Sequence, residues 1–501
     1  MTRSRFLALL TWGFLLLLIY TRVRLHQARR VEAASGEARA AFAPTLAFPT
    51  PTPWPGQPTP TPLPTREPLP QGTLVDYTAQ PGDSFAALAR RFHADLTELL
   101  RANPELPPDI TTLPPGYPLR VPYYYFPTWG SPFKILPDAL FVNGPASRDF
   151  DTAAFVAQYP GWLKAYQGYA MDTQYTGPLA VDMVARNYSI SPRLLLALLE
   201  YRAAALSDPN SPGAYMLGFR GYQNRGLFLQ LSRAAMLLNH GYYAWRLGHL
   251  DTLILSDGTE VRLDPWLNAA TAALHYYFAR TLPADAYHQA VSPQGFFRLY
   301  AALFGDPWQH PPAPHLPANL RQPELVFPMP VGHAWSYTGG PHPAWGDELL
   351  PWAAVDFAPA GVRGCEISRD WAVALADGVV TRSGRGIVVL DLDGDGDERT
   401  GWVIFYLHLV DTPPVGTRLR RRDPIGHPSC EGGHATGSHV HLARRYNGEW
   451  MDPEGPVPWV MEDWVVVKGE RPYDGWLKLG DWYVRASPRG TNDTLIAAGR
   501  K

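Results

Sequence analysis

The sequence predicts a multidomain α+β protein in which a small βααβ module, an all-α domain and an antiparallel β-sheet domain follow one another along the chain. The chain has 501 residues, far more than one ordinary domain of roughly 150 residues requires. Apolar residues recur at helical spacing through residues 127–325, whereas short apolar runs broken by glycine and proline follow residue 326. The 52 prolines are unevenly spread, which indicates that part of the chain is linker.

The charge balance argues against a nucleic-acid partner. The 44 Lys and Arg residues nearly cancel the 46 Asp and Glu residues, so the chain lacks the excess of positive charge that phosphate binding requires. We therefore expect no nucleic acid among its ligands.

Residues 1–30 are predicted to be an export or membrane-insertion signal. Arg3 and Arg5 precede an apolar run over residues 6–20. This run is shorter than the roughly 20 residues that span a bilayer. No small-residue cleavage site follows closely, and four arginines come instead. We therefore favour an uncleaved membrane anchor, with a cleaved signal peptide of a secreted protein as the alternative.

Residues 31–72 are predicted to be a linker. The segment 43–70 is a low-complexity stretch of proline and threonine, which cannot form a core and favours extended polyproline II structure. We favour a stiff spacer between the anchor and the folded domains over a disordered tail without a role.

A small module is predicted over residues 73–123. A strand leads into the Gly-Asp-Ser turn at 82–84, which can cap a helix with apolar residues at helical spacing. A second helix, 96–102, ends before Pro104, and a strand at 119–122 closes the module. With its PGD, NP and PG-x-x-L-x-VP motifs, this module resembles the LysM domain. The resemblance implies binding to glycans that contain N-acetylglucosamine, such as peptidoglycan; an unrelated small α+β domain is the alternative.

The next domain, residues 124–325, is predicted to be all-α. Its segment ISPRLLLALLEYRAAALSDPNSPGAYMLGFR resembles, over a short stretch, the catalytic helix and following loop of lysozyme-like lytic transglycosylases. In that family a glutamate acts as general acid at the place that aligns with Arg202, and arginine cannot release a proton near neutral pH. Glu200 lies about 200° around the helix from that place. We therefore expect a degenerate domain that binds or positions glycan without cleaving it. The helical patterns cover residues 177–186, 194–205, 227–247 and 267–281.

Residues 326–501 are predicted to form an antiparallel β domain with a C-terminal extension. Their sharpest feature is His439-Val440-His441, because side chains alternate along a strand and both imidazoles then face the same side. Such a pair is typical of metal sites, although paired histidines also occur on solvated strands. Asp356 in AVDFAPAG and His408 in FYLHL lie on further predicted strands.

This pattern resembles the lysostaphin-like (LytM-like) zinc peptidases over residues 326–475. The commonest first motif of that family is H-x-x-x-D, but Trp352 stands four residues before Asp356, and tryptophan cannot bind zinc. A subgroup that resembles staphylolysin and the β-lytic peptidases takes this histidine from a longer upstream loop, a placement that His342 in GGPH matches. We therefore choose His342 over His333.

The resemblance implies a role for each site residue. His342, Asp356 and His441 would bind Zn²⁺ in three tetrahedral positions and leave the fourth for water. Zinc would acidify that water and polarise the scissile carbonyl. His408 and His439 would orient the water, shuttle its proton and stabilise the oxyanion. A partly buried strand histidine without a catalytic role is the alternative for His408.

Two smaller features carry expectations of their own. In an oxidising compartment, Cys365 and Cys430 would pair as a disulfide. The acidic stretch from Asp391 to Asp395 matches half of an EF-hand loop, but Trp402 occupies the position of the bidentate glutamate. A hairpin turn is therefore favoured there, with a non-standard calcium site as the alternative.

Together these resemblances imply a peptidoglycan hydrolase of the cell envelope. It would be an extracytoplasmic zinc metalloendopeptidase that cleaves peptide crosslinks, binds glycan strands through its LysM module and contacts the membrane through its N-terminal segment. The alternative is a non-catalytic peptidoglycan-binding scaffold or an activator of another wall hydrolase, for which the departure at Trp352 is the support.

Overall fold

The computed structural model describes residues 69–125, 130–170, 173–346 and 349–499. The predicted anchor at residues 1–30 and nearly all of the predicted linker at 31–72 lie outside the described residues. Within the described ranges, each helix is too short or too polar to cross a membrane. All of these residues belong to one structural unit, Leu63–Lys501.

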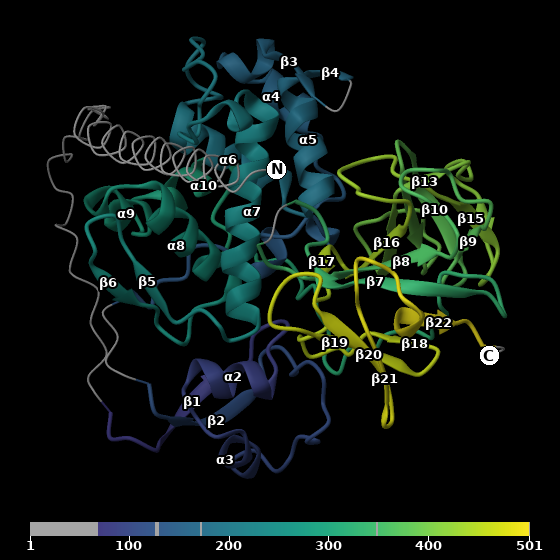
Figure 1. Cartoon of the computed structure of the whole chain (residues 1–501). Helices are drawn as coiled ribbons and strands as arrows, with labels where there is room; N and C mark the ends of the chain where they lie inside the picture. The colour runs from purple at the N-terminus through teal and green to yellow at the C-terminus, as the bar shows by residue number, and fades with distance from the viewer. Residues whose placement is uncertain (1–68, 126–129, 171–172, 347–348, 500–501) are drawn as a thin grey trace, which may run out of the picture. The chain divides into compact units, whose positions relative to one another are not determined.

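The first described element group is a βααβ module, drawn in purple and blue in Figure 1. Its elements are β1 (Thr73–Thr78), α2 (Phe85–Arg91), α3 (Leu96–Arg101) and β2 (Pro118–Tyr123). Ser84 caps α2 by accepting the Ala87 N–H at 3.2 Å. The two strands pair antiparallel, with Thr73 opposite Tyr123. The predicted order of strand, helix, helix and strand is confirmed.

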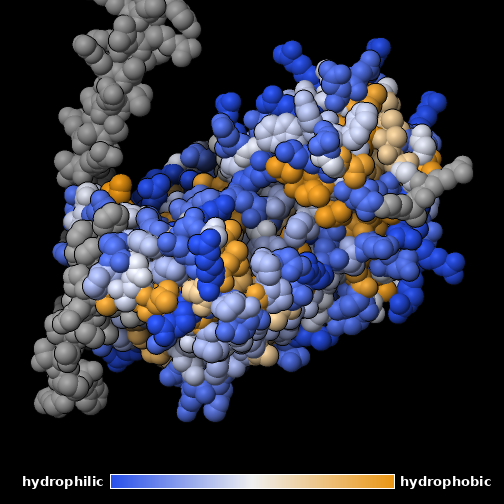
Figure 2. Space-filling model, turned by 90° about the horizontal axis from the view of Figure 1, so that it is seen from below, coloured by the Kyte–Doolittle hydropathy of each residue, from blue (hydrophilic) through white to orange (hydrophobic). Residues whose placement is uncertain are grey.

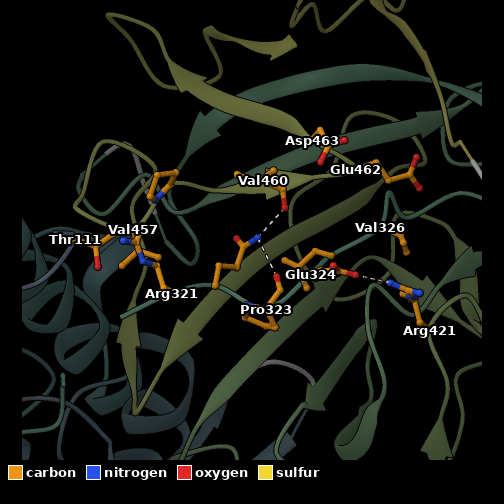
Figure 3. A pocket seen from close by; sticks show the side chains of 13 residues that line it. Thr111, Arg321, Pro323, Glu324, Val326, Arg421, Val457, Val460, Glu462 and Asp463 are labelled. Carbon is orange, nitrogen blue, oxygen red and sulfur yellow. Dashed lines mark hydrogen bonds and ion pairs between the residues drawn. The ribbon is translucent and has the colours of Figure 1, made fainter. Parts of the chain in front are cut away.

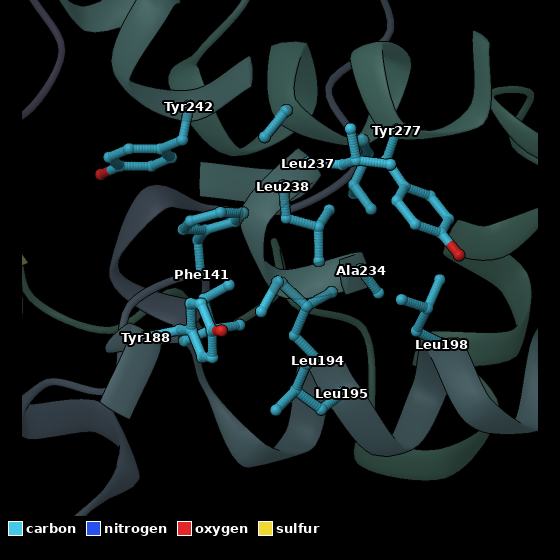
Figure 4. Packing of buried hydrophobic residues seen from close by; sticks show 14 of the residues in the cluster. Phe141, Tyr188, Leu194, Leu195, Leu198, Ala234, Leu237, Leu238, Tyr242 and Tyr277 are labelled. Atoms are coloured by element: carbon cyan, nitrogen blue, oxygen red, sulfur yellow. The ribbon is translucent and has the colours of Figure 1, made fainter. Parts of the chain in front are cut away.

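The middle domain consists mainly of helices around one hydrophobic core. Its helices are α4 (Thr152–Ala157), α5 (Gly177–Tyr188), α6 (Pro192–Ala203), α7 (Leu227–Arg246), α8 (Ala269–Thr281), α9 (Ala284–Ala290) and α10 (Phe296–Phe304). Figure 4 shows side chains of α6 and α7 facing one another, among them Leu194, Leu198 and Leu238, all fully buried. The four longest predicted helical patterns correspond to α5, α6, α7 and α8.

Two short hairpins accompany these helices, so the domain is not made of helices alone. They are β3 (Gln167–Ala170) with β4 (Thr173–Thr176), and β5 (Thr252–Ile254) with β6 (Glu260–Arg262). Their strands have three or four residues each, which is too short to give a clear period-2 signal in the sequence.

Glu200 and Arg202 at the end of α6 are both engaged in local structure. The Glu200 carboxylate accepts the Leu206 N–H at 2.7 Å, which binds the loop after the helix to its last turn. The Arg202 guanidinium donates to Thr281 Oγ1 at 3.0 Å and so connects α6 to the end of α8. Both side chains thus stabilise the local structure at the end of α6.

The C-terminal domain is built on a large antiparallel sheet. The strand order is β14-β10-β11-β12-β16-β8-β7-β22, and β17 pairs with β16. The bounds are β7 (Ala334–His342), β8 (Ala354–Pro359), β10 (Gly378–Gly384), β11 (Ile387–Asp391), β12 (Trp402–Leu407), β14 (Arg418–Leu419), β16 (Val440–Tyr446), β17 (Glu449–Trp450) and β22 (Leu495–Ala497). The antiparallel β prediction is confirmed.

Two smaller sheets accompany the large one. The first has the order β13-β15-β9 and the second β18-β19-β20-β21. Figure 1 shows the second sheet in yellow, near the C-terminal end. The bounds are β9 (Ala372–Val373), β13 (Leu409–Val410), β15 (Pro424–Pro428), β18 (Val460–Met461), β19 (Trp464–Lys468), β20 (Gly475–Leu479) and β21 (Trp482–Arg485).

The two faces of the large sheet contribute to different hydrophobic cores, because side chains alternate along each strand. Leu442 belongs to the core of the β domain itself. Phe405 and Ala443 belong to the core that contains the helices of the middle domain. His441 alternates with Leu442 and lies opposite Asp356 in the register. These two candidate site residues therefore lie on the face that the helical domain covers.

A disulfide joins Cys365 to Cys430, whose Cα atoms lie 5.3 Å apart. This confirms the predicted pairing. The bridge closes a segment of 65 residues and connects the loop after β8 to the loop before β16. The Ser438 N–H of the second loop also donates to Gly364 O of the first at 2.7 Å.

The acidic segment after β11 is the connection of a hairpin, as predicted, because β11 and β12 pair antiparallel. The Asp391 carboxylate accepts the N–H groups of Asp393 and Gly396 at 3.2 and 2.9 Å. The carboxylates of Asp391, Asp393 and Asp395 lie within 4.8 Å of one another. Burial raises the pKa of Asp391 to about 7. Arg148 of the middle domain forms an ion pair with Asp395 at 3.3 Å, so this loop also contacts the middle domain.

Candidate metal centre

Three adjacent strands bring His342, Asp356 and His441 together. His342 is the last residue of β7, Asp356 lies in β8 and His441 lies in β16, with β8 between the other two strands. The register of β7 against β8 shifts between Gly339 and His342, which places the imidazole beside the carboxylate. A Cβ atom on Gly339 would lie 2.5 Å from the Asp356 carboxylate, so glycine is required there.

The three side chains converge through one donor atom each. His342 Nε2 lies 2.9 Å from His441 Nδ1, and Asp356 Oδ1 lies 3.3 Å from the first and 3.2 Å from the second. Donor atoms about 2.0 Å from a tetrahedral zinc ion are separated by about 3.3 Å. The triangle therefore has the size of one face of such a coordination shell.

The hydrogen bonds of the two imidazole nitrogens that point away from the triangle show that the converging ring nitrogens are bare acceptors, meaning acceptors that carry no proton. His342 Nδ1 lies 2.7 Å from Gly340 O and His441 Nε2 lies 3.1 Å from Ala344 O. A carbonyl oxygen only accepts, so each of these nitrogens carries the proton, and in a neutral ring the other nitrogen presents its lone pair. Asp356 Oδ1 is buried and has no hydrogen-bond donor. Three converging acceptors of this kind fit a cation.

Electrostatics keep the site in the protonation states that bind metal. Burial acts to raise the pKa of Asp356, but the positive charge that protonation of His342 or His439 would place beside the carboxylate holds this pKa well below its usual range. Burial lowers the pKa of His441. The carboxylate is thus ionised and the His441 imidazole neutral at neutral pH.

A second pair of histidines lies beside the triangle. His439 Nδ1 donates to Gly437 O at 2.8 Å, and His439 Nε2 points toward Asp356 Oδ1 at 3.6 Å. His408 Nδ1 donates to Glu431 O at 2.8 Å, and its ring lies 4.5 Å from that of His439. Burial, with help from His439, lowers the pKa of His408 to about 3. His408 also has a φ of 69°, a strained backbone conformation of the kind that gathers at functional sites.

The other two residues weighed in the sequence lie elsewhere. His333 is half exposed and pairs with Asp370 at 3.5 Å, outside the triangle. Trp352 packs under the Lys468 ammonium, which lies 4.4 Å from its ring. The structure thus brings together the five predicted site residues and leaves His333 out.

Tyr473 is a neighbour of the site that sequence reasoning missed. Its ring stacks on the His342 imidazole, with centroids 4.1 Å apart and planes 16° from parallel. It lies in the turn between β19 and β20, and its N–H donates to Pro341 O at 3.1 Å. No motif in the sequence connects this turn with the site.

A separate cavity of 340 Å³ lies apart from the metal centre. Among its lining residues, the Gln322 side-chain amide donates to Val460 O at 2.7 Å. Figure 3 shows the Glu324 carboxylate pairing with Arg421. Thr111 of the βααβ module also lines it. It shares no residue with the three converging side chains.

Two family descriptions match the chain. The one described as "LysM domain" matches residues 77–122, and the one described as "LasA, N-terminal domain" matches residues 134–319. The LysM resemblance is confirmed. The middle segment is matched by the second description, so the likeness to lytic transglycosylases stays a prediction.

The chain is similar to two curated proteins. Protease LasA of Pseudomonas aeruginosa (strain UCBPP-PA14) is 25% identical over 344 residues, which are 64% of this chain and 75% of LasA. Beta-lytic metalloendopeptidase of Achromobacter lyticus is 27% identical over 139 residues, 26% of this chain and 35% of that protein.

Among solved structures, the chain is similar to the M23 metalloprotease pseudoalterin and to the catalytic domain of lysostaphin from Staphylococcus simulans. The first is 21% identical, with 33% of this chain and 96% of that chain covered and a TM-score of 0.29. The second is 22% identical, with 24% and 89% covered and a TM-score of 0.18.

Proposed function

We propose, from the relationship of this chain to LasA and to the β-lytic metalloendopeptidase, that it is a zinc-dependent endopeptidase acting on peptide bonds of bacterial cell-wall peptidoglycan. The observation that carries the proposal is the convergence of three bare acceptors, one each from His342, Asp356 and His441. Two neutral imidazoles and one carboxylate form a common ligand set of catalytic zinc sites, which keep a fourth position open.

The residues of the chain divide the chemistry between them. Zinc, when bound, acidifies a water molecule and polarises a carbonyl group. Asp356 supplies one negative charge, so the ligand set leaves the ion net positive. The His439 and His408 imidazoles lie next to the ligands, where a ring nitrogen can accept the proton of the attacking water and return one to the leaving amine. Their backbone partners Gly437 and Glu431 fix the ring orientations.

The LysM domain would bring this chemistry to its substrate. Binding of glycan strands by the module at residues 77–122 would raise the local concentration of peptide crosslinks around the centre. We place the protein in the extracytoplasmic cell envelope, secreted or held by its N-terminal segment. The disulfide between Cys365 and Cys430 supports an oxidising compartment.

The competing proposal of a non-catalytic scaffold loses its support. That proposal rested on Trp352 in the first-motif position, but His342 lies where the missing donor is needed, 3.3 Å from Asp356.

Metal content and hydrolysis test the proposed function directly. The full chain should contain about one zinc per molecule and release free amino groups from purified sacculi. A zinc chelator should stop the release, and added zinc should restore it. Release that continues in the metal-free protein, or metal-loaded protein that releases nothing, would contradict the proposal; the second outcome would favour a scaffold.

A further inference from the structure

The hairpin of β20 and β21 presents large aromatic side chains to solvent. The exposed fractions are 77% for Trp482, 68% for Tyr483 and 51% for Tyr473, just before the hairpin. In the view of Figure 2, hydrophobic residues form separate patches on a mainly hydrophilic surface. Single exposed apolar residues are normal, but a group of exposed aromatic residues within one turn and one hairpin is characteristic of a binding surface.

Cross-strand pairing arranges this surface regularly. Trp476 lies opposite Arg485 and Lys478 opposite Tyr483, so these four residues share one face of the hairpin, here called the hairpin platform. The Arg485 guanidinium lies 5.9 Å from the Trp476 ring. The opposite face holds Leu477, which is buried in the core of the domain. The outward face therefore alternates aromatic rings with cations.

The turn that leads into this hairpin contacts the candidate metal centre. The ring of Tyr473 stacks on His342, and Tyr473 lies two residues before Gly475, the first residue of β20. The Gly340 N–H donates to Tyr473 O at 2.9 Å, and the Tyr473 N–H donates to Pro341 O at 3.1 Å. The hairpin is thus fixed to the segment that carries the candidate ligand.

We propose that the hairpin platform binds the glycan strand of peptidoglycan with its attached stem peptides, next to the bond that is cut. This inference rests on the proposed function and adds a substrate-docking surface to it. Pyranose rings present apolar C–H faces that pack on aromatic rings. Stem peptides carry carboxylates that pair with Lys478 and, in competition with Asp474 at 3.2 Å, with Arg485. A surface on which aromatic rings alternate with cations fits a polymer that carries both pyranose rings and carboxylates. It fits an uncharged glycan or a protein surface less well.

Two variants of the full chain test this surface. Tyr483→Ala removes ring area from the hairpin platform, and Lys478→Glu with Arg485→Glu reverses its charge, all at exposed side chains whose removal exposes no core. For each variant, hydrolysis of purified sacculi is compared with hydrolysis of a short free peptide that cannot reach the platform. We expect the ratio of kcat/KM on sacculi to that on the peptide to fall about fivefold or more in both variants.

A matched control is Tyr222→Ala, which removes an 86% exposed ring from the middle domain and should leave the ratio as it is. Zinc content of each variant checks that the centre is intact. If the ratio is unchanged in both variants, the hairpin platform does not bind the substrate. Hydrolysis of sacculi by the parent chain would still support the proposed function. The proposal would also be overturned if only the charge variant lost activity on sacculi and the same variant showed the same loss with a phosphate polymer. That result would favour an anionic wall polymer as the ligand.

Discussion

The Tyr242 hydroxyl of α7 donates a hydrogen bond of 2.7 Å to the Glu449 carboxylate of β17, and both side chains are buried. Arg246 lies 3.2 Å and His315 Nε2 2.7 Å from the same carboxylate oxygen. A buried negative charge with these partners connects the helical domain to the β domain. Breaking such a buried pair is costly because it leaves the remaining charge without compensation.

Glu449→Gln should lower the free energy of unfolding at pH 7 by roughly 1.5 to 3 kcal/mol, because Arg246 loses one of its two buried carboxylate partners and keeps only Asp138, 3.2 Å away. Burial acts to raise the pKa of Glu449, but Arg246 and His315 lower it to about 2, from a usual value of 4.5. The stabilisation is therefore present above pH 4.5 and is lost as the pH falls toward 2. Denaturant unfolding at pH 7 and at pH 3 measures both effects.

The control for that experiment is Glu324→Gln, at a side chain that is 92% exposed and paired with Arg421. Its effect should stay below about 1 kcal/mol at either pH. A Glu449→Gln deficit that is as large at pH 3 as at pH 7 would contradict the assigned role of the carboxylate charge.

His342→Ala should lower zinc affinity by more than about a hundredfold and abolish hydrolysis, because one of three protein ligands is lost. His333→Ala, at a half-exposed residue outside the triangle, should retain both properties. Zinc titration and sacculus hydrolysis of the two variants are the measurements. If His333→Ala lost zinc affinity and hydrolysis while His342→Ala kept both, the zinc ligand would be His333 and not His342.

Removing the disulfide with Cys365→Ser and Cys430→Ser should lower the free energy of unfolding by roughly 4 kcal/mol in the chain-entropy treatment, since the bridge closes 65 residues. Thermal or denaturant unfolding of the parent and double variant gives the difference. Protein isolated from the envelope should resist alkylation until it is reduced. Two thiols that react in the native protein would refute the pairing.

Glu200→Gln should leave peptidoglycan chemistry unchanged and cost about 1 kcal/mol of stability, because the carboxylate accepts the Leu206 N–H. The parent chain should release no anhydro-muropeptides from sacculi. Glu260→Gln, on the hairpin of β5 and β6, is the matched surface control. Anhydro products that the parent releases and that Glu200→Gln does not would make the middle domain a second catalytic unit.

The sequence predicted the local parts of the site better than its surroundings. His439 and His441 were identifiable because strand alternation is a property of neighbouring residues. His342 required a longer inference, since only the bulged pairing of β7 with β8 places it beside Asp356. Tyr473 was not predicted, because its stacking on His342 depends on how a distant turn packs, and nothing in local spacing encodes that.

The same limit applies to Glu449. Its charge is visible in the sequence, but its burial between domains follows from the packing of α7 against β17, and an isolated acidic residue is most often solvated. The helices of the middle domain were predicted from their own periodicity. Their position on the site-bearing face of the sheet depends on long-range contacts and had no sequence signal.

The position of the helices on the site-bearing face of the sheet affects any attempt to produce the β domain as a shortened protein. Phe405, Leu407 and Ala443 belong to a core completed by the helices, so a chain starting at residue 326 would present them to water beside the metal centre. An exposed apolar area of this kind promotes aggregation. A usable truncated enzyme would therefore need polar replacements at these sheet positions, introduced without disturbing His441, which Leu407 opposes in the register.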